Sequence, residues 1–283
     1  MDVTIGVVIV PQFGADMNRM REAWVAAERL GVDRLYTADH FFVPRPADYK
    51  ARRSTTLDPN AGRPPIGDDE PPNFEAATIE AAMCVTTHRP EIACLVHCYP
   101  YRNPNLLADM TRTMDHLSGG RFVLGIGCGF HVRDFEEYGY QLGSYGSRLR
   151  ELEQGLETIR ARWTKLVPPP TRRIPILMSG RGEKVALRLV AEHADEWHCF
   201  GDLDYLKAKT AVLEDWCEKV GRDPSEIRRV SVVADPGNPD NDPDDLLEAG
   251  FTHLIVMSYG PDWDLGMLRE LLRWRDARVA ARA

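Results

Sequence analysis

The feature of this sequence that most constrains its fold is a regular alternation of short apolar runs with segments of helical periodicity. The first run, 3–10, is β-branched, and in 17–30 the apolar residues then recur three and four positions apart before Gly31, a frequent helix stop. Strands are predicted at 3–10, 33–37, 92–98, 121–126, 174–178, 196–200, 227–234 and 252–257, and helices at 17–30, 74–87, 103–117, 146–166, from 182 to about 193, 205–220, 242–249 and 265–279. Eight such repeats favour a closed (β/α)8 TIM barrel over an open, doubly wound sheet.

Residues 44–72, between the second strand and the second helix, interrupt this alternation. The segment is rich in proline and charge and has little apolar periodicity. A stretch of this length without secondary structure is typical of an active-site lid or a flexible loop. Since no linker divides the rest of the chain, the sequence predicts a single α/β barrel domain over 1–283 with a long insertion loop after strand 2.

Composition restricts the classes of function. The net charge is −8, with acids and bases interspersed, whereas a nucleic-acid binder needs a basic stripe. The six cysteines form no CxxC pair, which indicates reduced thiols and a cytoplasmic location. Neither a signal peptide nor a membrane-spanning run is evident. We therefore expect a protein that handles small molecules, with no nucleic-acid or membrane partner.

Candidate catalytic residues follow two predicted strands, at the barrel end where active sites of this fold lie. The second strand ends at Asp39-His40 and the third at His97-Cys98. His40 suits proton transfer or a hydrogen bond to a reactive ring, and a structural role is the alternative. No third ligand has a spacing that matches His97 and Cys98, so no metal site is predicted. The absence of a GxSxG motif disfavours a serine hydrolase.

Glycine-rich turns follow two further strands. The turn 125–129 has the spacing GxGxG, which differs from the GxGxxG dinucleotide fingerprint. It could admit a flat ring close to the backbone or form a tight turn at the barrel rim. The turn 179–182 precedes a predicted helix, and Arg181 and Lys184 add positive charge there. Bare amides at such a position bind anions, although a plain helix start is the alternative.

Several of these motifs, in this order, resemble the bacterial luciferase-like monooxygenase superfamily. The matching stretches are Asp39-His40, 101–104, 113–121, 124–129, 179–184, 187–191 and 194–197. They cover nearly the whole chain apart from 44–72 and the C-terminal third of the barrel. The stretch from 182 to 195 is most similar to the branch that uses coenzyme F420, an 8-hydroxy-5-deazaflavin, rather than FMN.

The resemblance implies a luciferase-like barrel, a cofactor and a set of site residues. It assigns catalysis to His40, as the group that exchanges the proton, and to Asp39, which orients His40 or contacts the ring. It also implies a non-prolyl cis peptide in a bulge at Cys94-Leu95. The cofactor-binding residues that it implies are Asp39, Cys94, Leu95, Val96, His97, Gly127, Cys128, Gly129, Ser179, Gly180, Arg181 and Gly182. The expected reaction is hydride transfer between F420 and a small organic substrate.

One departure from the family pattern concerns the substrate. Related sugar-phosphate dehydrogenases carry a catalytic glutamate after the glycine turn, where this chain has Phe130. Two other functions stay open: an FMN-dependent monooxygenase that uses reduced flavin and oxygen, and a protein that binds the cofactor without catalysis. The resemblance also implies a homodimer, with a flavin or F420 reductase as an indirect partner.

Overall fold

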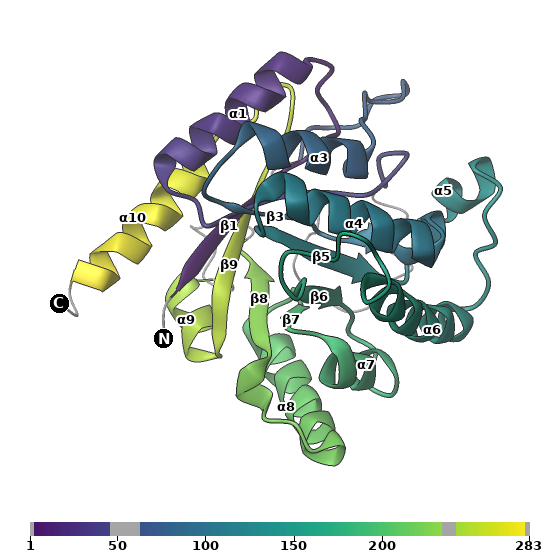
Figure 1. Cartoon of the computed structure of the whole chain (residues 1–283). Coiled ribbons are helices and arrows are strands. Elements are labelled where there is room, and N and C mark those ends of the chain that lie inside the picture. Colours follow the sequence, from purple (N-terminus) through teal and green to yellow (C-terminus); the bar gives the residue numbers. More distant parts are fainter. Residues whose placement is uncertain (1–2, 46–62, 234–241, 281–283) are drawn as a thin grey trace.

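The computed structural model of the chain describes residues 3–45, 63–233 and 242–280, and its strands form a closed parallel barrel surrounded by helices (Figure 1). The strands are β1 (Thr4–Ile9), β2 (Arg34–Thr37), β3 (Glu91–Cys94), β4 (His97–Cys98), β5 (Phe122–Gly127), β6 (Ile176–Ser179), β7 (Glu196–His198), β8 (Arg228–Val232) and β9 (Phe251–Ser258). Neighbouring strands pair in parallel around the ring, and the closing contacts join β3 and β4 to β5. The predicted (β/α)8 fold is thus confirmed.

The predicted strand 92–98 is divided into two short strands, β3 and β4. Both pair with β5, so together they occupy one position in the barrel. Leu95 and Val96 lie between them and form the bulge. The non-prolyl cis peptide joins Leu95 to Val96, one residue later than the Cys94-Leu95 position that the resemblance implies.

The helices follow the predicted alternation. They are α1 (Met17–Leu30), α3 (Ala76–Thr86), α4 (Pro104–Ser118), α5 (Val132–Glu137), α6 (Tyr145–Trp163), α7 (Ala186–His193), α8 (Leu203–Val220), α9 (Pro243–Glu248) and α10 (Gly266–Ala280), with short 3-10 turns at Tyr99–Tyr101 and Pro224–Glu226. Helix α1 shows how the sequence sets the bounds: the Asp16 carboxylate accepts hydrogen bonds from the first turn, and Gly31, with φ +92°, ends the helix. Helix α5 and the 3-10 turns were not predicted, because one or two helical turns carry no clear apolar periodicity.

Apolar side chains fill two layers of the molecule. The larger core lies between the helices and the outer face of the barrel, and a smaller cluster fills the barrel interior. The inner cluster consists of Val8, Val10, Tyr36, Ala93, Val123, Leu177, Val230 and Ile255. Half-buried apolar residues pack on it from the C-terminal strand ends, namely Leu95, Val96, Val232, Met257 and Tyr259. The barrel is therefore packed inside and presents an apolar surface at its C-terminal mouth.

A buried charged cluster closes the opposite, N-terminal end of the barrel. The guanidinium of Arg34 donates hydrogen bonds to Glu196, at 2.7 Å, and to Glu91, at 3.0 Å. Arg34 also donates to the Tyr36 hydroxyl, which lies 3.0 Å from Nε2 of His253. We call these five residues the lower network. Because all five lie at the N-terminal ends of strands or point there, the network is separated from the mouth by the apolar interior.

Part of the predicted loop 44–72 can be placed. Residues 46–62, which make up most of the predicted lid, lie outside the described residues. Where the described chain resumes, Arg63 donates a 2.6 Å hydrogen bond to the carbonyl of Pro44. The single-domain assignment over 1–283 stays a prediction. Among the described residues, no helix has the length and apolar character required to cross a membrane.

Candidate active site

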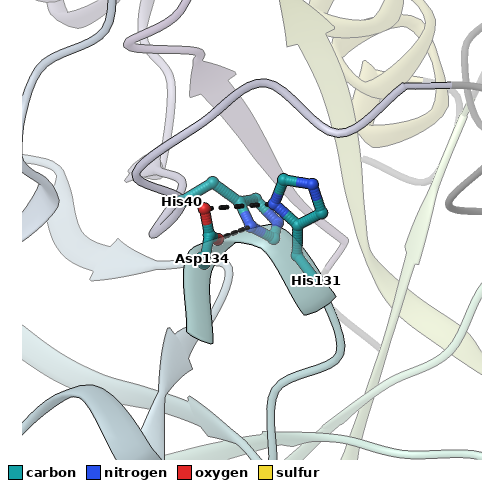
Figure 2. Close-up of side chains that lie close together, drawn as sticks. All are labelled: His40, His131 and Asp134. Atoms are coloured by element: carbon teal, nitrogen blue, oxygen red, sulfur yellow. Dashed lines mark hydrogen bonds and ion pairs between the residues drawn. The ribbon is translucent and has the colours of Figure 1, made fainter. Parts of the chain in front are cut away.

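The side chain of His40 meets the start of α5 just beyond the C-terminal end of β2. His40 follows β2 by three residues, and α5 follows the glycine turn at the end of β5. The Nδ1 atom of His40 lies 3.0 Å from one carboxylate oxygen of Asp134, and Nδ1 of His131 lies 3.1 Å from the other (Figure 2). Two histidines therefore share one carboxylate. His40 keeps about 20% of its side chain exposed, whereas Asp134 is completely buried.

Asp134 is held by two further donors. The backbone N–H of Phe42 donates at 2.9 Å to the oxygen nearer His131, and the Tyr101 hydroxyl donates at 2.7 Å to the oxygen nearer His40. Burial alone would raise the pKa of Asp134, but the hydrogen bonds from the two histidines and Tyr101 outweigh it and hold the pKa well below its ordinary value. Asp134 is therefore a carboxylate anion at neutral pH.

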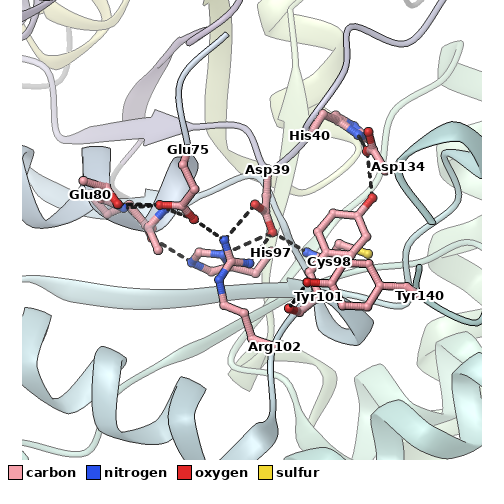
Figure 3. Close-up of polar contacts among 12 residues, drawn as sticks. Asp39, His40, Glu75, Glu80, His97, Cys98, Tyr101, Arg102, Asp134 and Tyr140 are labelled. Carbon is pink, nitrogen blue, oxygen red and sulfur yellow. Dashed lines mark hydrogen bonds and ion pairs between the residues drawn. The ribbon is translucent and has the colours of Figure 1, made fainter. Parts of the chain in front are cut away.

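Asp39 belongs to a different buried cluster, beside α3 (Figure 3). Its carboxylate accepts two hydrogen bonds from the Arg102 guanidinium, at 2.6 and 3.0 Å, and one from the backbone N–H of Cys98 at 2.9 Å. Burial opposes ionisation, yet hydrogen bonds from His97 and Arg102 hold the pKa of Asp39 below its ordinary value. Of the two roles expected for Asp39, orienting His40 or contacting the ring, the structure does not show the first: the carboxylate on His40 is that of Asp134, and Asp39 binds Arg102.

His97 lies in the same cluster and is completely buried. Its Nε2 is 2.7 Å from a carboxylate oxygen of Glu80 in α3, and its Nδ1 is 3.5 Å from Asp39. Burial would lower the pKa of His97, but the charge of Glu80 and the hydrogen bonds to both carboxylates raise it to about 9. The imidazolium side chain thus points toward α3, and only its backbone can border the mouth.

The glycine turn 125–129 allows a close approach of the protein's own backbone. A Cβ atom on Gly125 would lie 1.9 Å from the carbonyl oxygen of Cys94, and one on Gly129, where φ is +72°, would lie 2.3 Å from the Cys98 sulfur. Of the two interpretations that the sequence left open, these contacts support the tight rim turn at both positions. Gly127 faces Val96 of the bulge, with 2.9 Å to a built Cβ.

The turn 179–182 is more open than the glycine turn. Helix α7 begins only at Ala186, so the turn does not lead directly into a helix as predicted. The Trp197 indole donates a 2.8 Å hydrogen bond to the carbonyl of Gly180, and the Arg181 guanidinium lies over the ring of Phe200 at 4.6 Å. These contacts fix the turn and hold a cation beside the mouth.

The predicted cofactor residues fall into two groups by accessibility. The side chains of Asp39, Cys94 and His97 are buried, as is Gly127. Leu95, Val96, Cys128, Gly129, Ser179, Gly180, Arg181 and Gly182 are partly exposed. The accessible members come from the β3–β4 bulge and from the ends of β5 and β6, all on the mouth side of the barrel.

Sequence reasoning missed Asp134, His131 and Tyr101 as members of this site. The spacing of His131 and Asp134, three residues apart directly after a glycine turn, is the one signal that could have found them. The ligand-type atoms of His40, His131 and Asp134 lie within 4.8 Å of one another, a spacing that a metal ion could also use. Because both carboxylate oxygens already accept hydrogen bonds from Phe42 and Tyr101, we describe the cluster as hydrogen-bonded.

Known proteins share parts of this sequence and fold. An uncharacterized protein of Mycobacterium tuberculosis is 32% identical over 179 residues, which span 58% of this chain and 62% of that protein. An F420-dependent secondary alcohol dehydrogenase, solved with an F420-acetone adduct, has a TM-score of 0.76 at 17% identity, covering 95% of this chain and 98% of that one. The oxygenating component of 3,6-diketocamphane monooxygenase from Pseudomonas putida, solved with FMN, has a TM-score of 0.67 at 15% identity and 96% coverage of both chains.

The match to a protein family is longer than the sequence alignment with the mycobacterial protein. Residues 3–234, which include every strand of the barrel except β9, match the family described as luciferase-like monooxygenase. This range contains His40, the glycine turn, α5 and the turn 179–182. The chain therefore belongs to the luciferase-like monooxygenase family of oxidoreductases.

Proposed function

We propose that this protein transfers a hydride between coenzyme F420 and a small organic substrate bound at the barrel mouth. The observation that carries the proposal is the arrangement of three features at one end of the barrel. Half-buried apolar residues cover the strand ends, His40 stands at one side, and the Arg181 turn lies at another. A flat apolar ring with an anionic tail requires a surface of this kind.

The residues at the mouth fit a deazaflavin. Leu95 and Val96 of the bulge, with Val232 and Met257 across the barrel, offer apolar contact to a ring. Gly180 and Gly182 have no side chains to obstruct a phosphate, and a Cβ at Gly180 would lie 3.1 Å from that of Ala186. Arg181 supplies the positive charge. Asp39, Cys94 and His97 lie behind this surface and support the bulge and the strand ends.

The chemistry divides between the cofactor and the protein. Coenzyme F420, when bound, supplies or accepts the hydride. His40 exchanges the proton that accompanies the hydride, because it is the partly exposed imidazole at the mouth and is hydrogen-bonded to a carboxylate. The Phe130 ring packs edge-on against His40 at 5.2 Å, which limits water near that imidazole and favours an apolar substrate.

The test is titration of the purified protein with oxidised F420 and, separately, with oxidised FMN, followed by absorbance and fluorescence. We expect saturable binding of F420. Replacing His40 by alanine should lower turnover about 10²–10⁴-fold while leaving the affinity for F420 within a few-fold of the parent value. Unchanged turnover in His40→Ala would remove the proton-transfer role from this residue.

The second candidate is an FMN-dependent monooxygenase, favoured by the FMN-bound neighbour and by the name of the family. In that case the same apolar surface would hold the isoalloxazine ring, and a separate reductase would supply reduced flavin. Tight binding of FMN with none of F420 would reverse the order of the two proposals. The homodimer and the cytoplasmic location also stay proposals, and sedimentation tests the first.

A further inference from the structure

We propose that Asp134 is the positioning residue of the active site: it fixes the tautomer of His40 so that Nε2 is the nitrogen that exchanges the proton. This inference rests on the proposed function in one respect, the role of His40 in proton transfer. The part that concerns the tautomer stands on the geometry of the protein alone. Asp134 thus takes the orienting role that was one of the two expected for Asp39.

A direct hydrogen bond joins His40 to Asp134. An ionised carboxylate only accepts hydrogen bonds, so the proton of neutral His40 must reside on Nδ1, 3.0 Å from Asp134. Among the described residues, Nε2 of His40 has no hydrogen-bond partner, and the side chain is about 20% exposed. Nε2 is therefore the lone-pair nitrogen available to a substrate hydroxyl or carbonyl.

Asp134 is itself immobilised. It is completely buried and accepts hydrogen bonds from the Tyr101 hydroxyl, the Phe42 N–H and the His40 imidazole, and Nδ1 of His131 lies 3.1 Å from it. Phe42 stands two residues after His40, so one carboxylate anchors both the ring of His40 and the backbone that follows it. A side chain held by three donors has a single orientation, which a positioning group requires.

The His40 ring is also packed against other side chains on its remaining sides. Phe130 and His131 meet it edge-on, at ring-centroid distances of 5.2 and 5.5 Å. The amide of Asn73 donates hydrogen bonds to the carbonyl oxygens of His40 and Phe41. With the ring and the main chain both fixed, the direction of Nε2 is determined by the bond to Asp134.

With this tautomer, Nε2 of His40 can accept the proton of a substrate hydroxyl. When a substrate hydroxyl is oxidised, its C–H electron pair leaves as hydride to the deazaflavin, its O–H bond breaks, and an N–H bond forms at Nε2 of His40. Asp134 stabilises the resulting imidazolium through Nδ1–H without taking its proton. In Asp134→Asn, the side-chain amide could donate to Nδ1 of His40 and would favour the opposite tautomer, with the proton on Nε2.

The experiment measures the tautomer directly, in cofactor-free protein labelled with ¹⁵N-histidine. We expect long-range ¹H–¹⁵N correlation spectra to show the Nδ1–H tautomer for His40, assigned by its loss in His40→Ala. Asp134→Asn should shift the signal toward the Nε2–H tautomer, and Asp134→Glu should restore it. An Nε2–H tautomer in the parent protein, or no change in Asp134→Asn, would overturn the proposal even if that variant were inactive.

Activity supplies the second readout. Turnover of Asp134→Asn should fall about 10²-fold with KM and F420 affinity near the parent values, and Asp134→Glu should recover at least a tenth of the parent turnover. Asp115→Asn is the matched control, because Asp115 is equally buried but accepts from Thr171 and contacts no histidine. Parent-like turnover in a folded Asp134→Asn would overturn the proposal.

The same samples test whether His40, His131 and Asp134 bind a metal ion. Co²⁺ added to the parent protein should produce no visible absorption band and should leave the His40 nitrogen signals in place. A band that disappears in Asp134→Asn would mean that Nδ1 binds metal rather than Asp134, and would overturn the assignment. Failure to bind F420, by contrast, would reject the proposed function and leave the tautomer measurement valid, so the two failures are distinguishable.

Discussion

The two ends of the barrel each bury a network of charges, and the networks differ in the group at their centre. The lower network is built on Arg34, a cation that does not titrate, and every carboxylate in it faces that guanidinium. At the mouth, the two clusters contain histidines: His40 and His131 on Asp134, and His97 on Glu80. Among the histidines of these networks, His40 at the mouth is the one with a partly exposed side chain, whereas His253, His97 and His131 are buried.

This difference indicates what each end is for. A permanent cation with paired carboxylates gives a fixed charge state over a wide pH range, which suits closure of the barrel floor. Its histidine is kept neutral: burial, and then the charge of Arg34, hold the pKa of His253 well below its ordinary value. An imidazole hydrogen-bonded to a carboxylate, with its other nitrogen accessible, suits proton transfer. The comparison predicts that substitutions in the lower network mainly change stability and that substitutions around His40 at the mouth mainly change turnover.

The largest expected effect comes from replacing Arg34 by methionine. This change removes the guanidinium that donates to both carboxylate oxygens of the buried Glu196 and leaves it only Arg228, at 3.7 Å. Removing one partner of a buried ion pair costs about 3–5 kcal/mol of unfolding free energy. Urea unfolding measures the loss. Arg19→Met is the control, because Arg19 and its partner Asp262 are exposed and their ion pair contributes about 1 kcal/mol or less.

The comparison also limits what Arg34→Met should do to activity. The fraction that remains folded at low temperature should bind F420 with parent affinity, because the apolar barrel interior separates Arg34 from the mouth. A large loss of cofactor affinity with little loss of stability would show that the lower network communicates with the site. The division between the two ends would then be wrong.

The pH dependence of stability gives the next largest effect, and the two ends should act in opposite directions. His97, with a pKa raised from 6.5 to about 9, binds a proton in the folded state that the unfolded chain releases above pH 6.5. Its contribution is complete below pH 6.5 and is lost as the pH rises through 9, a fall of about 2 kcal/mol between pH 6.5 and 8.5. His253, with a lowered pKa, stays neutral when folded, so stability falls as the pH drops below 6.5.

Two variants separate these slopes in urea unfolding measured from pH 5 to 8.5. The thiols of the unfolded chain begin to ionise near pH 8 and lower stability equally in the parent and in both variants. His97→Gln should remove the decline of about 2 kcal/mol that His97 itself contributes above pH 6.5 and keep the decline below it. His253→Gln should reduce the decline on the acid side and leave the alkaline side unchanged. If the unfolding free energy of His97→Gln declined above pH 6.5 as steeply as that of the parent, the ion pair of His97 with Glu80 would not cause the decline.

The sequence predicted the fold well, because the fold depends on local patterns that repeat. Every predicted strand has its counterpart, and the bounds of α1 and α4 follow from their caps, Asp16 and Asn103 at one end and Gly31 and Gly119 at the other. The division of strand 92–98 was expected only as a bulge through the family resemblance. Its exact position depends on a contact between Gly125 and the Cys94 carbonyl, which join elements about thirty residues apart.

The candidate site was less predictable, because its pairs of side chains come from distant segments. Adjacent in sequence, Asp39 and His40 point to different clusters, one to Arg102 and the other to Asp134. Successive residues after a strand do point in different directions, so adjacency gave the wrong partner. The true partner is 94 positions away on a helix of six residues, too short to be seen as a pattern.

The smallest expected effect comes from replacing Tyr101 by phenylalanine. This variant tests whether a residue at the mouth can change the unfolding free energy with little change in turnover. Tyr101→Phe removes one O–H donor from the ionised Asp134 and keeps the ring that packs on Phe41 and Phe135. A hydrogen bond to a charged group contributes about 1.5 kcal/mol or somewhat more, and we expect a loss of that size in urea unfolding. Turnover should fall only a few-fold, because Phe42 still anchors the carboxylate.

The matched control for Tyr101→Phe is Tyr140→Phe. The Tyr140 hydroxyl donates a 3.0 Å hydrogen bond to the backbone carbonyl of Tyr101, so this variant loses a neutral bond in the same aromatic stack. Its loss of stability should be smaller, about 1 kcal/mol, and its turnover should equal that of the parent. Equal turnover in both variants would mean that one donor fewer does not loosen Asp134, and that the backbone N–H of Phe42 is sufficient to hold His40 in its working orientation.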